Sequence, residues 1–193
     1  MSSKKVFVTG GAGFIGSNYV ADLIRRGDEV TIYDNLSRPG VSYNIDWLNR
    51  EFGADAFRLI VGDVRDADKL EKEIGKPDVV AHFAAQVAVT TSVVNPREDF
   101  EINALGTFNV LEAVRKSGTQ PTVLYTSTNK VYGGMEDVRV SVGKTRYRYL
   151  DYPDGITEAQ PLDFHSPYGC SKGAGDQRSE EHTSELQSPT SIS

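Results

Sequence analysis

Short apolar runs alternate along the chain with stretches whose apolar residues recur at helical spacing. Runs at residues 6–8, 29–33, 57–63, 79–84 and 121–127 each have the length of a strand. Between them, residues 18–26, 42–50, 66–74 and 98–116 follow a helical pattern, and most of these stretches end near a glycine. Residues 79–84 are almost continuously apolar, as in a strand covered on both faces. The pattern predicts an α/β fold with a doubly wound parallel sheet.

A glycine-rich turn joins the first predicted strand to the first predicted helix. Glycines 10, 13 and 16 stand in the string Thr9-Gly-Gly-Ala-Gly-Phe-Ile-Gly16. Such a turn lets backbone amides approach a pyrophosphate at a helix N-terminus. The second strand leads into Asp34, where a carboxylate can bind the adenine-ribose hydroxyls of a dinucleotide. The alternative interpretation is a tight turn and a solvated aspartate that bind no ligand. The combination of strand, glycine turn, helix and Asp34 argues against it. We interpret residues 1–177 as a Rossmann domain that binds NAD.

Ligands on such sheets lie beyond the carboxyl ends of the strands. This rule draws attention to the residues that follow the second to fifth strands, which are Asp34, Asp63, Val64, Ala84, Ala85, Gln86, Ser127 and Thr128.

A tyrosine and a lysine that are suited to proton transfer follow these strands. Ser166 is a good helix N-cap and Pro167 a good first helical residue, so Tyr168 and Lys172 share one face of a helix. Lowering a phenol pKa from about 10 to about 7 requires roughly 4 kcal/mol of preferential phenolate stabilisation. An adjacent ammonium, the helix N-terminus and an oxidised nicotinamide can supply it together. Tyr168 is then a general base for a sugar hydroxyl, although such a pair is often only a solvated helix face.

Two stretches fall outside the alternating pattern. Residues 134–160 are irregular and rich in Tyr and Arg, which predicts a functional loop over the active-site face.

From residue 178 onward, serine and glutamate dominate and the apolar periodicity is lost. A natural disordered tail is one interpretation. We favour a non-native tail at residues 178–193, because the string is similar to a translated sequencing adapter. The Rossmann sheet would then be truncated after about five strands, where about six are usual.

Composition narrows the functional classes. The 193 residues leave room for one domain, and the net charge of −6 argues against nonspecific nucleic-acid binding. No apolar run reaches the length of a membrane span, and the first residues do not form a secretory signal. The single cysteine, Cys170, excludes an intrachain disulfide and fits a reducing compartment. The three histidines have no metal-ligand spacing. We expect a cytoplasmic protein without a metal, bound neither to nucleic acid nor to a membrane.

Four strings in the chain carry a family resemblance: residues 9–16, residues 34–37, Gly62-Asp63-Val64 and Tyr168-x-x-x-Lys172. They resemble the extended short-chain dehydrogenase/reductases that act on nucleotide sugars, the NAD-dependent epimerase/dehydratase family. Longer strings at residues 86–92, 127–133 and 162–172 are similar to members that invert C2 of a CDP-activated sugar. The resemblance implies a tightly held NAD, a nucleotide-sugar substrate (CDP-sugar favoured), a transient 2-keto sugar and a homo-oligomer at full length.

The resemblance also assigns roles by position. It assigns catalysis to Thr128, preferred over Ser127, and to Tyr168 and Lys172. It assigns cofactor contacts to Gly10, Gly13, Phe14, Ile15, Gly16, Asp34, Asn35, Ser37, Arg38, Asp63, Val64, Ala84, Ala85, Gln86, Asn103, Thr126, Tyr168 and Lys172. It assigns substrate contacts to Gln86, Thr128, Asn129 and Tyr168. Packing is the alternative role for Phe14 and Ile15, and a helix-to-loop hydrogen bond is the alternative for Asn103. Asp34 favours NAD because a carboxylate repels a 2′-phosphate, although Arg38 lies nearby in the sequence.

One difference from the family pattern bears on which reaction the protein catalyses. Sugar 4,6-dehydratases of this family carry an acidic pair directly after the strand-five hydroxyl, where this chain has Asn129 and Lys130. Dehydration is therefore disfavoured. An epimerase acting at C2 is the leading hypothesis. A UDP-sugar 4-epimerase or related dehydrogenase is the second, and a noncatalytic NAD-binding module is the third.

Overall fold

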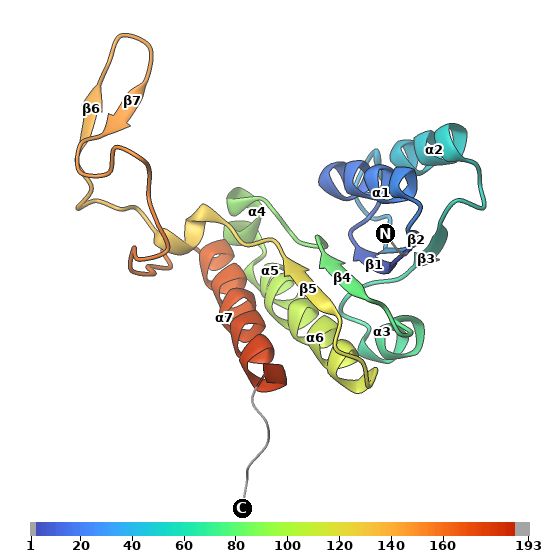
Figure 1. The fold of residues 1–193 in the computed structure, drawn as a ribbon. Coiled ribbons are helices and arrows are strands. Elements are labelled where there is room, and N and C mark those ends of the chain that lie inside the picture. The colour runs from blue at the N-terminus through green and yellow to red at the C-terminus, as the bar shows by residue number, and fades with distance from the viewer. Residues whose placement is uncertain (1–2, 188–193) are drawn as a thin grey trace, which may run out of the picture.

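The centre of the fold is a parallel sheet in the computed structural model, which describes residues 3–187 and the side chains of residues 3–180. Its five strands run in the order β3-β2-β1-β4-β5 (Figure 1). Their bounds are β1 (Lys5–Thr9), β2 (Glu29–Asp34), β3 (Arg58–Val61), β4 (Val79–His82) and β5 (Thr122–Tyr125). All five predicted strands are confirmed, the last three shorter than expected. The strand order reverses between β1 and β4, which is where sheets of this type bind ligands.

Helices cover both faces of the sheet, as the alternating pattern predicted (Figure 1). α1 (Phe14–Arg26) and α2 (Val41–Phe52) pack on one face, where Val20 and Leu48 join the core around Val8. α3 (Ala67–Glu73) and α6 (Gly106–Lys116) pack on the other, where Leu70 and Val110 join the core around Phe7 and neighbouring residues. Successive residues of β1 thus point into opposite cores, and the doubly wound fold is confirmed.

The predicted helix at residues 98–116 is divided into three parts. It consists of α5 (Pro96–Phe100), a π-helical turn η1 (Glu101–Leu105) and α6. The Asn95 side chain caps α5 by accepting a hydrogen bond from the Glu98 amide. A further short helix, α4 (Val89–Val94), was not predicted, because its sequence VTTSVV lacks an amphipathic period.

The prediction that residues 134–160 are irregular is wrong in part. They contain an antiparallel hairpin of β6 (Val140–Val142) and β7 (Tyr147–Tyr149), which projects from the body of the protein (Figure 1). The Gly143 amide donates to the Arg146 carbonyl and closes the hairpin turn. Residues 134–160 do not line the large cavity described below, and the expected loop over the active-site face stays a prediction.

The last described element is α7 (Pro167–Gln187), which crosses position 177 without a break. The boundary that we predicted there stays a prediction, and residues 188–193 of the proposed tail lie outside the described residues. Among the described helices, none combines the length and the apolar character needed to cross a membrane.

Candidate functional site

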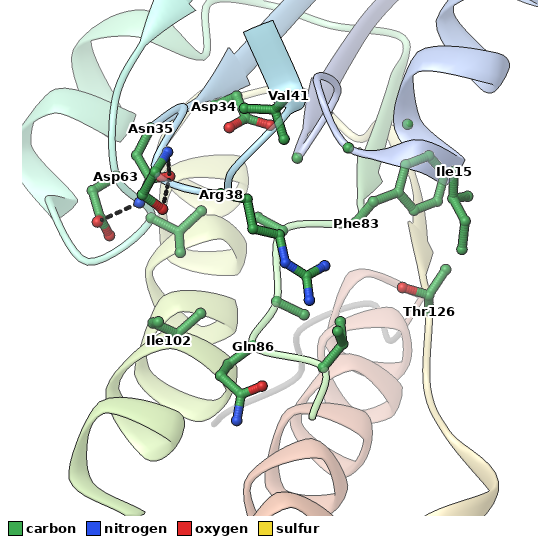
Figure 2. Close-up of a pocket in the computed structure, with 18 of the residues that line it drawn as sticks. Ile15, Asp34, Asn35, Arg38, Val41, Asp63, Phe83, Gln86, Ile102 and Thr126 are labelled. Carbon is green, nitrogen blue, oxygen red and sulfur yellow. Dashed lines mark hydrogen bonds between the residues drawn. The ribbon is translucent and has the colours of Figure 1, made fainter. Parts of the chain in front are cut away.

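A cavity of about 650 Å³ lies at the carboxyl ends of the strands (Figure 2). The residues predicted from the sequence that line it are Gly10, Gly13, Phe14, Ile15, Gly16, Asp34, Asn35, Ser37, Arg38, Asp63, Val64, Ala84, Ala85, Gln86, Thr126, Tyr168 and Lys172. Three predicted residues, Asn103, Thr128 and Asn129, are not among those that line it. The cavity volume is within the usual range for a small-molecule or cofactor site, roughly 300–1,000 Å³.

Sequence reasoning missed nine lining residues: Tyr33, Val41, Gly62, Phe83, Val87, Ala88, Thr91, Glu98 and Ile102. A tenth, Ser127, follows the fifth strand as the strand-end rule indicated, but Thr128 was preferred to it. Tyr33, Gly62 and Phe83 each adjoin a predicted site residue, so proximity to the strand ends could have found them. Thr91, Glu98 and Ile102 come from helices, where no sequence signal points to the cavity.

The glycine turn brings two strand ends unusually close together. Gly10 has a φ of +69°, and a Cβ there would lie 2.5 Å from the Ala84 amide nitrogen of the chain leaving β4. A Cβ at Gly16 would overlap the carbonyl oxygen of Gly10. Only glycine fits both positions, so the chain can turn tightly enough to place the N-terminus of α1 at the cavity. Phe14 and Ile15 are 83% and 63% exposed, so packing does not account for them.

Asp34 joins the glycine turn to the loop that follows β2. Its Oδ2 accepts a hydrogen bond from the Ala12 amide (3.0 Å), and its Oδ1 accepts one from the Leu36 amide (2.9 Å). Each carboxylate oxygen keeps a further lone pair for a ligand hydroxyl. Arg38 extends its guanidinium into the same part of the cavity (Figure 2).

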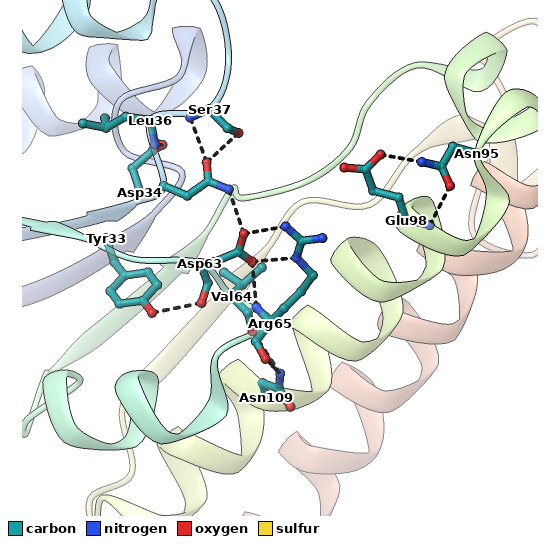
Figure 3. A network of polar contacts seen from close by, with 11 residues as sticks. Tyr33, Asp34, Leu36, Ser37, Asp63, Val64, Arg65, Asn95, Glu98 and Asn109 are labelled. Atoms are coloured by element: carbon teal, nitrogen blue, oxygen red, sulfur yellow. Dashed lines mark hydrogen bonds and ion pairs between the residues drawn. The ribbon is translucent and has the colours of Figure 1, made fainter.

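The carboxylate of Asp63 is tied to neighbouring loops (Figure 3). Arg65 donates to it from Nε (2.9 Å), from Nη2 (2.7 Å) and from its backbone amide (2.9 Å). Asn35 Nδ2 adds a fourth hydrogen bond (2.9 Å). The hydrogen bonds from Arg65 hold the pKa of Asp63 well below its usual range. About four donors saturate a carboxylate, so Asp63 orders this end of the cavity mainly through its loops.

Tyr168 and Lys172 project from the first turns of α7 into the cavity. Two hydrogen bonds hold the first turn of α7. Ser166 Oγ accepts one from the Gly169 amide (3.0 Å), and the Tyr168 amide donates the other to Ser92 Oγ (3.2 Å). Lys172 is 3% exposed. Its Nζ donates to the Thr126 carbonyl (2.6 Å) and lies 4.2 Å from the centre of the Tyr125 ring.

The environment of Lys172 makes its charge adjustable near neutral pH. Burial lowers the pKa of Lys172 to about 8, and the negative charges of Asp176 and Asp99 oppose this effect. A lysine in this state can carry a charge beside Tyr168 or give up a proton without a large change in pH.

The structure brings Ser127, rather than Thr128, to the cavity. Ser127 Oγ donates to Asp176 Oδ2 (2.8 Å). Thr128 instead caps the short helix η2 (Asn129–Tyr132) by accepting from the Lys130 amide, and Asn129 is exposed on that helix. The helix begins directly after Thr128 and turns the chain away from the cavity, so these two side chains do not line it. The catalytic role of Thr128 stays a prediction.

Asn103 lies behind the cavity wall and not on it. It is 1% exposed, and its side chain exchanges two hydrogen bonds with the backbone of Gln86 (2.9 and 3.0 Å). These are the helix-to-loop hydrogen bonds that we considered as the alternative, and the contact with cofactor is not supported. Asn103 shapes the wall by holding Gln86 in place.

Comparisons with known proteins agree with this geometry. A family model described as GDP-mannose 4,6 dehydratase matches residues 7–192. The CDP-paratose 2-epimerase of Salmonella typhi is 46% identical over 175 residues, which cover 90% of this chain and 51% of that protein. The chain thus spans about half the length of the curated relative that it matches.

Two solved structures of nucleotide-sugar enzymes are also similar to this chain over almost its whole length. The dTDP-glucose 4,6-dehydratase DesIV of Streptomyces venezuelae, with NAD and TYD bound, has a TM-score of 0.76 at 30% identity, covering 94% of this chain and 52% of that one. The UDP-Glc/GlcNAc 4-epimerase of Campylobacter jejuni has a TM-score of 0.78 at 26% identity, covering 95% and 50%.

The order of the strands, the glycine turn and the paired Tyr168 and Lys172 all correspond to what the sequence resemblance implied. The chain belongs to the family described by the GDP-mannose 4,6 dehydratase model, within the extended short-chain dehydrogenase/reductases that act on nucleotide sugars.

Proposed function

We propose that this chain binds NAD in the large cavity. The support comes from the chain's own residues. The tight turn that only glycine allows at positions 10 and 16 places the N-terminus of α1 at the cavity, where its partial positive charge favours a pyrophosphate. Asp34 retains acceptor capacity for ribose hydroxyls and disfavours the 2′-phosphate of NADP. A similar dehydratase of known structure contains NAD, which supports the same cofactor here.

We further propose that the protein is a nucleotide-sugar epimerase, and that it converts CDP-paratose to CDP-tyvelose by inverting C2. NAD, when bound, would accept and return a hydride. Tyr168 would remove the proton from the C2 hydroxyl and later give it back. Lys172 would hold the nicotinamide ribose and supply positive charge beside the phenol. The placement of Tyr168 and Lys172 at one cavity with the glycine turn is the observation that carries this proposal.

Two observations favour epimerisation at C2 within this family. The relative from Salmonella typhi is named a CDP-paratose 2-epimerase, and its 46% identity extends over 90% of this chain. Asn129 and Lys130 stand where dehydratases of the family carry acidic residues, and neither is a carboxylate that could assist loss of water. A CDP-sugar is therefore the proposed substrate.

The proposal can be tested by incubating the protein with CDP-paratose and following the sugar ring by NMR. Inversion at C2 without uptake of solvent deuterium supports the proposal, because the hydride would be returned and not exchanged. Inversion at C4 of a UDP-sugar would favour the second enzyme hypothesis instead. NAD binding without conversion of any nucleotide sugar would favour a noncatalytic module.

Location and assembly are also proposals. We propose a cytoplasmic enzyme, supported by the single free and exposed cysteine, Cys170, which suits a reducing compartment. We propose a homo-oligomer for the whole protein, in agreement with the family resemblance. Size-exclusion chromatography with light scattering would test the assembly.

A further inference from the structure

A buried carboxylate, Asp99 on α5, lies behind the cavity and is absent from its lining. Asp99 is 1% exposed. It accepts hydrogen bonds from Gln86 Nε2 (3.0 Å), Asn103 Nδ2 (3.2 Å) and Ser171 Oγ (2.5 Å). A carboxylate removed from water is strongly destabilising unless such donors surround it. Burial raises the pKa of Asp99, and the hydrogen bonds from Ser171 and Gln86 oppose this effect.

The three donors come from three different parts of the active-site region. Gln86 belongs to the cavity wall after β4, and its side chain also donates to the Ala88 carbonyl (2.9 Å). Asn103 belongs to η1. Ser171 is completely buried on α7 and lies between Tyr168 and Lys172 in the sequence. One carboxylate therefore connects the cavity wall with the helix that carries the proposed proton-transfer pair.

Ser171 makes the connection to α7 specific. Its hydroxyl donates to Asp99 Oδ2 and accepts from Asn103 Nδ2 (3.2 Å). Because the residue is followed directly by Lys172, any movement of Ser171 relative to α5 moves Lys172 with it. A hydrogen bond to a charged acceptor is stronger than a neutral one, so this contact resists such movement.

Asp99 also acts on Lys172 through its charge. The groups that face Lys172 are Asp99 of α5, Asp176 and Tyr168 of α7, the buried His82 of β4 and the Tyr125 ring of β5. Among them, Asp176 and, with a smaller effect, Asp99 raise the pKa of Lys172 against the effect of burial. Asp176 is partly exposed and also accepts a hydrogen bond from Ser127, and Asp99 acts from a position that is shielded from solvent.

We propose that Asp99 is a positioning residue: it fixes α7 through Ser171 and the cavity wall through Gln86, and it places a buried negative charge near the Lys172 ammonium. What Lys172 does for a bound cofactor rests on the proposed function. The placement and charge of Lys172 do not, and they can be measured without any ligand.

The test measures the ionisation of Lys172 by NMR of lysines labelled with ¹³C at Cε, with the signal assigned by its loss in Lys172→Arg. Asp99→Asn keeps the side-chain shape and removes the charge. Ser171→Ala keeps the charge and removes the link to α7. Asp46→Asn, an exposed position on α2, is the matched control for loss of one carboxylate. NAD affinity is measured by calorimetry in parallel, and circular dichroism establishes that each variant is folded.

We expect the Lys172 midpoint to move to lower pH in Asp99→Asn by about half a pH unit or more, a threefold loss in proton affinity, and to stay unchanged in Asp46→Asn. We expect Ser171→Ala to bind NAD about tenfold more weakly, because α7 loses its anchor. An unchanged midpoint in a folded Asp99→Asn protein overturns the proposal. If Asp99→Asn does not fold, Ser171→Ala decides, and parental NAD affinity in that variant overturns it. If no form binds NAD but the midpoint still moves, the proposed function fails and the charge role of Asp99 is supported.

Discussion

Acidification should destabilise this protein through one buried histidine, His82 on β4. His82 is 2% exposed, and its Nδ1 and Nε2 lie 2.6 Å from Thr9 Oγ1 and 3.0 Å from Thr107 Oγ1. Thr107 donates its hydroxyl proton to the Asn103 carbonyl (2.6 Å). Thr107 Oγ1 must then accept from Nε2–H, and Thr9 must donate to Nδ1. The site is built for neutral histidine, and a proton on Nδ1 would face the hydroxyl proton of Thr9.

The size of the effect follows from the difference between the folded and unfolded states. Burial lowers the pKa of His82 from 6.5 to about 3, and the positive charge of Lys172 acts in the same direction. Between these two values the unfolded chain binds one more proton than the folded protein, so the free energy of unfolding falls as the pH falls. The limiting slope is about 1.4 kcal/mol per pH unit, and the change is roughly 2.3 kcal/mol between pH 6.5 and 4.5, because the unfolded imidazole is only half protonated at pH 6.5. A typical domain has only about 5–15 kcal/mol to lose.

Urea unfolding measures this slope, with the fluorescence of Trp47, the single tryptophan, as the probe. The parent chain and His82→Gln are compared at several pH values between about 7 and 4.5. We expect His82→Gln to be less stable at pH 7 and to show a flatter dependence on pH. Carboxylates titrate in both proteins, so the difference between the two curves isolates His82. Parallel curves for the two proteins would refute the reasoning.

Three further outcomes follow from the cavity. Gly16→Ala should weaken NAD binding more than tenfold, because its methyl group would overlap the Gly10 carbonyl. Gly27→Ala is the control: its φ of +83° strains an alanine, but its Cβ would meet nothing within 4 Å, so this variant should lose stability and bind NAD normally. Equal affinities of the two variants in calorimetry would contradict this. Tyr168→Phe should bind NAD but lose at least about 10²-fold in epimerisation, since a general base is removed; an active variant in the NMR assay would exclude Tyr168 as the base. Asp34→Asn should narrow the preference for NAD over NADP by about tenfold, because the charge facing the 2′-phosphate is lost; an unchanged ratio of the two dissociation constants would argue against that role.

Much of the fold follows from local pattern. The alternation of apolar runs and amphipathic stretches sets the strands and most helices, and the run at residues 79–84 identified the interior strand β4. The hairpin at residues 140–149 was not predicted, because its strand pattern in the sequence is weak. Each strand alternates over only three residues, Val-Ser-Val in β6 and Tyr-Arg-Tyr in β7, and no Asn-Gly or Asp-Gly turn marks the hairpin.

The sequence predicted the site residues whose positions depend on the backbone. It predicted less well the residues whose side chains form hydrogen bonds elsewhere in the protein. Gly10, Gly16 and Asp34 lie where the turn and the strand end require them. Thr128 does not line the cavity, because a helix begins directly after it and its hydroxyl caps that helix. Asp63 shows the same limit. Its carboxylate is saturated by Arg65 of the same loop and by Asn35 of the loop after β2, which residue types alone do not reveal.

The π-helical turn η1 changes the phase of the helix in which it lies. An α-helix rotates by about 100° per residue, and the widened turn accommodates one residue more than an α-helical turn would. Residues before η1 are therefore offset by about one residue's rotation from those that follow it. Asp99, before the turn, meets Ser171 of α7, while Val110 and Val114, after it, pack on the sheet core. An uninterrupted α-helix could not present both sets in these directions. The extra residue thus lets one continuous helix serve two partners, and deleting it would turn the carboxylate away from the helix that carries Tyr168 and Lys172.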